Sequence, residues 1–348
     1  MSLYERVADL SLVIGAERRE RRDRDTSSGF TRATTTFVLD GEGETGQGED
    51  VTYDTEDHDA LADVGDLGLV GGYTVEEFSA ALDDIDLFPE REPERESSKR
   101  YRRWAIESAG LDLALRQAGT NLGEVLDLSY EPVRFVVSTR LGEPLSVDRV
   151  HEILDRHPEA EFKLDPTSEW TGDLIAEVAA TDAVKLLDLK GQYHGTVVDQ
   201  DPDPDLYERV FEGFPDAVIE DPALTARTQE YLEANTERIS WDAPITGVES
   251  IEALPFEPAW LNIKPSRFGT LSSLFETIEY CRKEGIKTYG GGQFELGVGR
   301  TQVQVLASLF YSDRPNDVAP GGYNDPDLPE GLPDSPLAPA EDPPGFGW

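Results

Sequence analysis

The sequence predicts an α/β protein with a modified (β/α)8-type barrel that lacks its final helix, and is thus (βα)7β-like, preceded by a smaller α+β domain. From residue 132 to residue 310, short strand-like runs alternate with helical segments. The runs are short and apolar, as expected of parallel strands that are buried on both faces. A chain of 348 residues is also long enough for two ordinary domains. We therefore expect three parts, at 1–128, 129–312 and 313–348.

The first part has a mixed pattern. The β-rich run 34–39 leads into a glycine-punctuated turn at 40–46, and an extended segment resumes at 47–49. Apolar residues at helical spacing predict a helix at 101–118. We expect two strands and several helices in this part.

The second part carries the alternation of strands and helices. Strands are expected at 133–138, 161–165, 183–188, 216–220, 238–242, 260–264 and 286–290. Helices are expected at 146–156, 169–180, 205–213, 225–235, from 248, at 271–284 and at 300–310. A last short strand near 316–319 would bring the strand-like segments to eight.

The last part is rich in proline, with nine of the 23 prolines between 313 and 348. This composition is compatible with a disordered tail. However, Leu332, Leu337, Phe346 and Trp348 are apolar enough to pack. We therefore expect an extended segment that lies on the first domain.

The chain is strongly acidic. It has 31 Lys and Arg residues against 71 Asp and Glu residues, a formal net charge of −40. Nucleic-acid binders need basic surface to neutralise phosphates, so that class of protein is excluded. Such a surface repels itself until the Debye length shrinks to about 3 Å near 1 M salt. We therefore expect the protein to come from a halophile with molar salt in its cytoplasm. The alternative is an acidic enzyme from a mesophile.

We expect a cytoplasmic protein. The paired arginines at 18–19 and 21–22 are similar to a twin-arginine export signal, but the polar segment 23–28 follows them where such a signal needs an apolar run. No membrane span is indicated. The single cysteine, Cys281, excludes a disulfide framework and a multi-cysteine metal site.

Three successive predicted strands end in a carboxylate, namely Asp188, Glu220 and Asp242. Reactive groups of such barrels project from the C-terminal ends of the strands, and adjacent strands lie about 4.8 Å apart. Three carboxylates this close would repel one another unless a cation lay between them. An oxygen-only ligand set suits Mg²⁺, with Mn²⁺ as a substitute. We therefore predict a metal site formed by these residues.

Lysine is scarce, with seven residues against 24 arginines, yet Lys163, Lys190 and Lys264 all fall at predicted strand ends. A lysine can act as a general base when burial or a nearby cation lowers its pKa from about 10.4 towards 7–8. A bound Mg²⁺ would supply such a cation. Other polar residues at these strand ends are candidates for contacts with substrate or with the metal ligands, and they are Asp165, Asp221, Gln293 and Glu295.

Several motifs at these strand ends are similar to those of a known family. The motifs are AVIEDP at 217–222, WD at 241–242, LNIKPSRFG at 261–269 and GGQFELGVG at 291–299. They resemble consecutive strand ends of the enolase superfamily, specifically its muconate lactonizing enzyme subgroup. The turn at 40–49, the helix segment at 105–115 and the sequence PGFG at 344–347 extend the resemblance over nearly the whole chain.

The resemblance implies a capping domain at 1–128 and a Mg²⁺-dependent enzyme that removes the proton α to a carboxylate, through an enediolate. It implies that the three carboxylates hold the metal, that Lys264 is the sixth-strand base or acid, and that Lys163 matches a second-strand lysine. Cap loops at 24–32 and 49–53 would then close over the site, and Arg24, Arg32 or Lys190 would bind a second carboxylate of the substrate.

Two departures from the family pattern leave alternatives open. The second strand usually reads Lys-x-Lys, whereas this chain has Lys163 and Asp165, so either residue can occupy the acid–base position. Lys190 stands where the family often has asparagine. A cation there would bind a substrate carboxylate or indicate altered chemistry.

The leading interpretation is an isomerase, that is, a racemase, an epimerase or a cycloisomerase, acting on a small carboxylate. A lyase of the o-succinylbenzoate-synthase or dehydratase type is an alternative. So are a Schiff-base aldolase that uses Lys264 as its nucleophile and a barrel that has become a non-catalytic binding protein. The resemblance also makes a homo-oligomer an expectation, because members of the family often form one.

Overall fold

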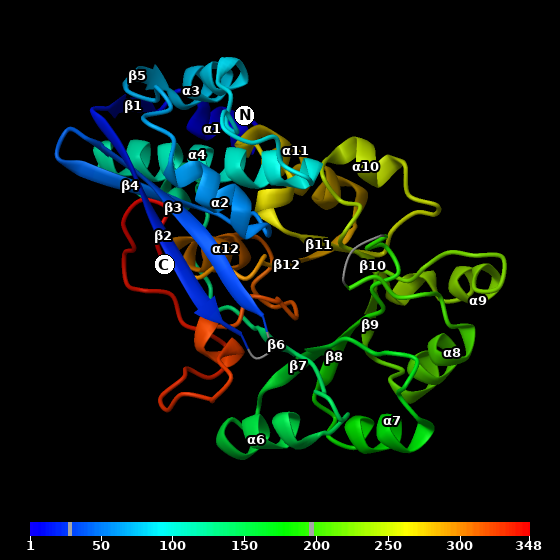
Figure 1. The fold of residues 1–348 in the computed structure, drawn as a ribbon. Helices are drawn as coiled ribbons and strands as arrows, with labels where there is room; N and C mark the ends of the chain where they lie inside the picture. The colour runs from blue at the N-terminus through cyan, green and yellow to red at the C-terminus, as the bar shows by residue number, and fades with distance from the viewer. Residues whose placement is uncertain (27–29, 195–197) are drawn as a thin grey trace.

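The computed structural model describes residues 1–26, 30–194 and 198–348, in which an α+β cap packs against a parallel β/α barrel (Figure 1). The strands of the cap are β1 (Ser11–Ile14), β2 (Ala16–Asp25), β3 (Thr31–Gly41), β4 (Glu44–Asp50) and β5 (Gly71–Thr74). Its helices are α1 (Leu3–Ala8), α2 (Thr55–Ala62), α3 (Val75–Ala81), the 3-10 helix η1 (Leu82–Asp84), α4 (Glu96–Gln117) and α5 (Leu122–Leu126).

The cap contains more strands than the two that were expected, and this is a correction. Among the described residues, β2, β3 and β4 form one antiparallel sheet and β1 and β5 form another. Strand β2 escaped prediction because it consists of Ala16 followed by arginines and acids, most of them exposed, so it carries no alternation of apolar residues. Strands β1 and β5 have four residues each.

The barrel strands form one parallel sheet in the order β12-β11-β10-β9-β8-β7-β6. They are β6 (Val136–Thr139), β7 (Glu161–Leu164), β8 (Val184–Asp188), β9 (Val218–Glu220), β10 (Ile239–Trp241), β11 (Trp260–Ile263) and β12 (Lys287–Gly290). The helices are α6 (Asp148–Arg156), α7 (Gly172–Ala179), α8 (Pro204–Gly213), α9 (Gln229–Glu233), α10 (Val248–Glu252), α11 (Leu271–Glu284) and α12 (Val298–Phe310), with 3-10 helices η2 (Thr236–Arg238), η3 (Pro265–Arg267) and η4 (Gly321–Asn324).

The segment expected to form a last strand near 316–319 closes the barrel without forming a regular strand. Phe135 next to β6 pairs with Asn316, and Gly291 after β12 pairs with Asp317, each as an isolated parallel bridge. The side chain of Asn316 supplies hydrogen bonds that the backbone of a regular strand would otherwise make. Its Oδ1 accepts from the Gly290 backbone N–H at 2.7 Å, and its Nδ2 donates to the Arg134 carbonyl at 2.9 Å. This segment therefore joins the first and last strands of the sheet.

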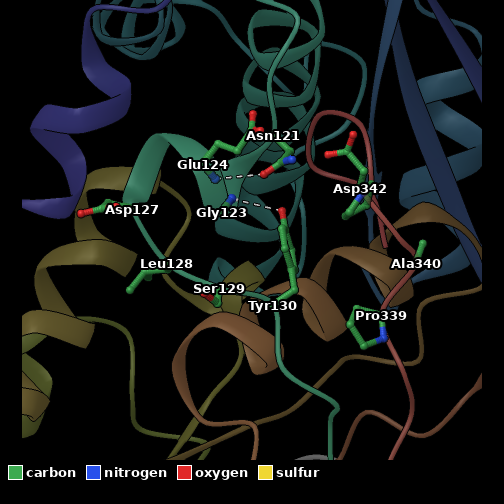
Figure 2. A pocket seen from close by; sticks show the side chains of 11 residues that line it. Asn121, Gly123, Glu124, Asp127, Leu128, Ser129, Tyr130, Pro339, Ala340 and Asp342 are labelled. Carbon is green, nitrogen blue, oxygen red and sulfur yellow. Dashed lines mark hydrogen bonds between the residues drawn. The ribbon is translucent and has the colours of Figure 1, made fainter.

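The proline-rich segment runs from the barrel to the cap. The backbone of Leu337 pairs with Val133 at the start of the barrel, and Gly345 accepts from the Leu122 N–H of α5 at 3.1 Å. The Phe346 ring lies edge-on to Trp104 of α4, with ring centroids 6.4 Å apart. Figure 2 shows this segment beside α5, where the two line a polar cavity of about 410 Å³.

The cap and the barrel share buried contacts. The Glu107 carboxylate of α4 accepts the Leu271 N–H at the start of α11 at 2.8 Å, which satisfies a helix N–H that would otherwise lack a partner. One cluster of buried apolar side chains contains residues from both parts, including Trp104 and Phe275. In the described part of the chain, no helix combines the length and the hydropathy needed to cross a membrane.

We expect Gly48→Ala to destabilise the protein. Gly46 and Gly48 let β4 lie directly on α4, and a Cβ at Gly48 would come within 2.0 Å of the Ala105 carbonyl oxygen. Overpacking of this kind costs about 1–3 kcal/mol, measured as a lower free energy of unfolding and a lower Tm. Gly72→Ala is the matched control, because a Cβ there meets no atom of the described structure within 4 Å. Equal Tm values for the two variants would contradict this account of β4.

Candidate active site

The three carboxylates predicted to bind metal lie together at the C-terminal end of the barrel sheet. Asp188 and Glu220 are the last residues of β8 and β9, and Asp242 follows β10 directly. Each is fully buried, and one oxygen of each lies within 4.8 Å of an oxygen of the other two. Alternate residues of a barrel strand face the interior, and Asp188, Glu220 and Asp242 occupy such inward-facing positions.

Lysines from neighbouring strands contact these carboxylates. Lys163 of β7 donates to Glu220 Oε1, and its Nζ lies 3.4 Å from Asp188 Oδ2. Lys190, in the loop after β8, donates to Asp188 Oδ2. Lys264, directly after β11, lies 2.9 Å from Asp242 Oδ2. The lysines selected by their scarcity therefore surround the carboxylate cluster.

The carboxylates respond differently to this environment. Burial would raise the pKa of Asp188, but Lys190 and Lys163 hold it well below its usual range. Burial would also raise the pKa of Asp242, yet Arg267 and Lys264 lower it. For Glu220, burial dominates over the attraction of Lys163, and its pKa rises to about 8. The lysines alone therefore do not fully stabilise three negative charges.

The residues of this cluster fit a divalent metal ion. All three donors are carboxylates, the ligand type that Mg²⁺ prefers. Among the described residues, the buried Asp242 Oδ1 has no hydrogen-bond partner, so it remains free to serve as a ligand. A divalent cation would also favour the ionised form of Glu220. The cluster thus fits the Mg²⁺ site that the sequence resemblance implies.

Two family profiles match the chain. The C-terminal domain of DUF8230, a domain of unknown function, matches residues 129–325, and the N-terminal domain of DUF8230 matches residues 5–125. The chain belongs to the DUF8230 family. A stretch of 59 residues is 36% identical to the o-succinylbenzoate synthase of Bacillus subtilis, and it spans 17% of this chain and 16% of that protein.

Solved structures show the fold of this DUF8230 chain. The dipeptide epimerase of Methylococcus capsulatus, complexed with Mg and L-Arg-D-Lys, matches with a TM-score of 0.73 and 18% identity over 97% of this chain and 99% of that chain. The muconate lactonizing enzyme of Pseudomonas putida matches with a TM-score of 0.63 and 17% identity over 88% of each chain. An enolase-superfamily member from Listeria innocua matches with a TM-score of 0.60 and 20% identity, over 90% and 84%. The predicted fold class is confirmed.

The second barrel strand places Lys163 and Asp165 on the same face, because they are two residues apart. Lys163 is the deeper of the two, with 2% of its side chain exposed, and it contacts carboxylates of Glu220, Asp188 and Asp317. Burial opposes its charge, but these carboxylates raise the Lys163 pKa well above its usual value. Asp165 lies nearer the mouth, where Lys190 Nζ is 3.6 Å away, and both side chains are 14% exposed.

Asp221 supports the backbone that follows β10. Its two carboxylate oxygens accept the backbone N–H groups of Asp242 and Ala243, each at 2.8 Å. Burial and the neighbouring Asp242 raise the pKa of Asp221 to about 7. Asp221 therefore fixes the backbone of Asp242 and Ala243.

Gln293 and Glu295, in the loop after β12, face different partners. Gln293 Oε1 accepts from the Tyr53 hydroxyl of the cap at 2.9 Å, and Gln293 is buried. Glu295 accepts the Gln293 N–H at 2.5 Å and lies 2.9 Å from Arg300 of α12. Gln293 thus joins the cap to the barrel mouth, whereas Glu295 shapes the loop.

The arginines expected to contact substrate have structural partners. Buried Arg32 donates to the carbonyl oxygens of Thr52 at 2.6 Å and Gln293 at 3.1 Å, which holds the cap loop against the barrel. Arg24 lies 3.5 Å from Asp325. Residues 27–29 of the segment 24–32 lie outside the described residues.

Sequence reasoning missed several residues of the site. These are Asn262, Arg267, Tyr289 and Asp317. Asn262 carried a usable signal, because it precedes Lys264 by two positions and must share its face of the strand. Asp317 carried none, since its approach to Lys163 depends on how the chain returns after α12.

We expect Mg²⁺ to raise the Tm of this protein. A ligand that binds the folded state alone stabilises it by about 2.7 kcal/mol at one hundred times its Kd. Asp242→Asn should abolish most of this shift, because it removes a ligand whose Oδ1 has no other partner among the described residues. Asp313→Asn, at an exposed acid paired with Arg314, is the control.

The measurement is a thermal melt with MgCl₂ against KCl of equal ionic strength. An unchanged Mg²⁺ shift in Asp242→Asn would contradict the assignment of this cluster as the binding site.

Proposed function

We propose that this DUF8230 chain is a Mg²⁺-dependent enzyme of the muconate lactonizing enzyme-like subgroup, which removes the proton α to a carboxylate and acts as an isomerase. The observation that carries the proposal is the buried cluster of Asp188, Glu220 and Asp242 with lysines on both sides of it. The likeness to a dipeptide epimerase and to a muconate lactonizing enzyme agrees with it. Racemisation, epimerisation and cycloisomerisation all belong to this proposal.

Each polar group has a role in this mechanism. The three carboxylates would hold Mg²⁺, which supplies Lewis-acid stabilisation of negative charge on the substrate carboxylate. Lys264 Nζ accepts the α proton, and the electrons of the broken C–H bond move into the carboxylate to leave an enediolate. In this step the amine form of Lys264 accepts the proton and becomes an ammonium.

A second proton carrier is needed on the other side of the substrate carbon for racemisation. The sheet order places β9 and β10 between β8 and β11, so Lys190 and Lys264 reach the mouth from different sides. Lys190 is more exposed than Lys163, at 14% against 2% of the side chain. We assign the second proton transfer to Lys190 with Asp165 beside it, and we assign Lys163 to holding Glu220. The catalytic role that the sequence predicted for Lys163 stays an untested prediction, and this proposal differs from it.

A lyase of the o-succinylbenzoate-synthase or dehydratase type is the second candidate. The observation that favours it is the 36% identity to an o-succinylbenzoate synthase over 59 residues. An elimination needs one proton acceptor and one acid for the leaving group, which the same lysines can supply. The two candidates therefore differ in the substrate rather than in the site.

Exchange of the α proton with solvent tests the mechanism. We expect Lys264→Met to slow deuterium uptake from D₂O into a library of small carboxylates by about 10²–10⁴-fold, the usual contribution of a general base. Lys190→Met should lower racemisation by a similar factor. Lys185→Met, which removes a lysine bound to the Asp182 carbonyl outside the barrel mouth, is the matched control.

The outcomes separate the alternatives. Uptake that stays unchanged in both Lys264→Met and Lys190→Met would refute the two-lysine mechanism. Substrate trapped on Lys264 by borohydride in the presence of EDTA would instead indicate the Schiff-base aldolase. Loss of proton exchange in Lys163→Met alone would assign the second proton transfer to Lys163 of the second strand.

We further propose that the enzyme works as a homo-oligomer in the cytoplasm of a salt-adapted cell, on a small carboxylate rather than on nucleic acid. The net charge of −40 supports the salt-adapted setting.

We expect the Tm to rise steeply between 0.1 and 3 M KCl, because salt screens the repulsion of exposed carboxylates. Thermal melts over this range are the measurement. A flat dependence would favour an acidic mesophilic protein.

A further inference from the structure

Tyr289 of β12 lies below the carboxylate cluster, inside the barrel. Its ring is fully buried in a small apolar cluster with Val136, Leu186 and Val218, one from each of three other barrel strands. The ring fills the lower layer of the barrel interior, as bulky side chains commonly do in such barrels. Its hydroxyl points the other way, because it donates to Glu220 Oε2.

The two oxygens of Glu220 have different partners. Oε2 accepts from the Tyr289 hydroxyl and, at 3.1 Å, from Asn262 Nδ2 of β11. Oε1 accepts from Lys163 Nζ, at the level of the other carboxylates. Uncharged donors from the strands β11 and β12 therefore engage the inner oxygen, whereas the outer oxygen meets the charged groups of the site.

A third hydroxyl extends the network. Ser240 of β10 is buried, and its Oγ lies 2.9 Å from the Tyr289 hydroxyl oxygen. Since the Tyr289 proton is directed to Glu220, Ser240 acts as the donor to Tyr289. Hydrogen bonds in such a chain polarise and strengthen one another.

From this arrangement we infer that Tyr289 is a positioning residue for the metal centre. It holds the inner oxygen of Glu220 so that the carboxylate presents its outer oxygen to a divalent cation in one fixed orientation. This inference rests on the proposed metal site, and it concerns how this chain prepares its ligand. Groups that orient a ligand in this way typically change metal affinity by 10–100-fold when they are removed.

A space-filling role alone would not require a hydroxyl at this position. Phenylalanine would pack the lower layer as well and would avoid placing a phenol in a dry interior, where a polar group without a partner is costly. Gly291, on the same face two residues later, leaves room for this network, because a Cβ there would come within 2.3 Å of Asn262 Oδ1. The hydroxyl is therefore explained by Glu220.

The test is metal affinity in Tyr289→Phe, which keeps the ring and removes the hydroxyl. We expect the Kd for Mg²⁺, measured by calorimetry at high salt, to rise at least tenfold. The electron paramagnetic resonance spectrum of bound Mn²⁺ should broaden, because Glu220 can then adopt more than one orientation. Tyr323→Phe is the matched control, since it also removes a buried hydroxyl that donates a hydrogen bond, to the Pro333 carbonyl at 2.9 Å. It should leave both readouts unchanged.

A second variant keeps the test informative if Tyr289→Phe fails to fold. Ser240→Ala leaves the Tyr289 ring untouched and removes the donor to its hydroxyl. We expect a smaller rise in the Kd, about threefold, because the lost hydrogen bond joins two uncharged groups. The inference would be overturned if folded Tyr289→Phe kept both its Kd and its Mn²⁺ spectrum unchanged. If only Ser240→Ala folds, an unchanged Kd in that variant would overturn it. Either outcome would leave the metal centre intact. Absence of Mg²⁺ and Mn²⁺ binding by the unsubstituted protein would instead overturn the metal centre together with it.

Discussion

The site is governed by one constraint, the cost of keeping three carboxylates together in a dry barrel interior. Asp188, Glu220 and Asp242 are fully buried, and their closest oxygens lie within 4.8 Å of one another. Like charges at such distances in a low dielectric repel strongly, and each also loses its hydration. Positive charge must therefore lie nearby, and Lys163 and Lys264 meet this need from the flanking strands.

The side chains inside the barrel form layers that stabilise the buried carboxylates. Alternation along the strands brings the charged residues to the upper layer, and Val136, Leu186, Val218 and Tyr289 form an apolar cluster in the layer beneath them. The lower layer excludes water, while hydrogen bonds from Tyr289 and Asn262 replace the hydration that Glu220 loses. The cap adds the upper boundary, where Arg32 binds backbone carbonyls of both domains. Strong electrostatics and fixed geometry thus arise from the same packing.

Much of this arrangement could be predicted, because strand ends in a parallel barrel meet at one edge. The carboxylates were found by their position at strand ends and the lysines by their position and scarcity, and the parallel sheet follows from the alternation of strands and helices. The partners of each group could not be predicted. That Lys163 lies deep and meets Asp317 depends on the path of the chain after α12, and Tyr289 sits in a strand, KTYG, whose pattern does not distinguish interior from exterior. Strand β2 was missed because all of its residues after Ala16 are charged, so no alternation of hydropathy marks it.

Arginine and lysine differ in chemistry, and this difference accounts for the placement of the scarce lysines at the site. The cap uses arginine for permanent structural contacts, as where Arg102 forms a buried ion pair with Asp50 at 2.8 Å and donates to the Asp57 carbonyl. A guanidinium suits this because it stays charged and offers several donors in a fixed plane. It cannot give up a proton under ordinary conditions, so it is unsuited to proton transfer. Under the proposed mechanism a proton has to move at two places in the site, and Lys190 and Lys264 would supply the amino groups for it.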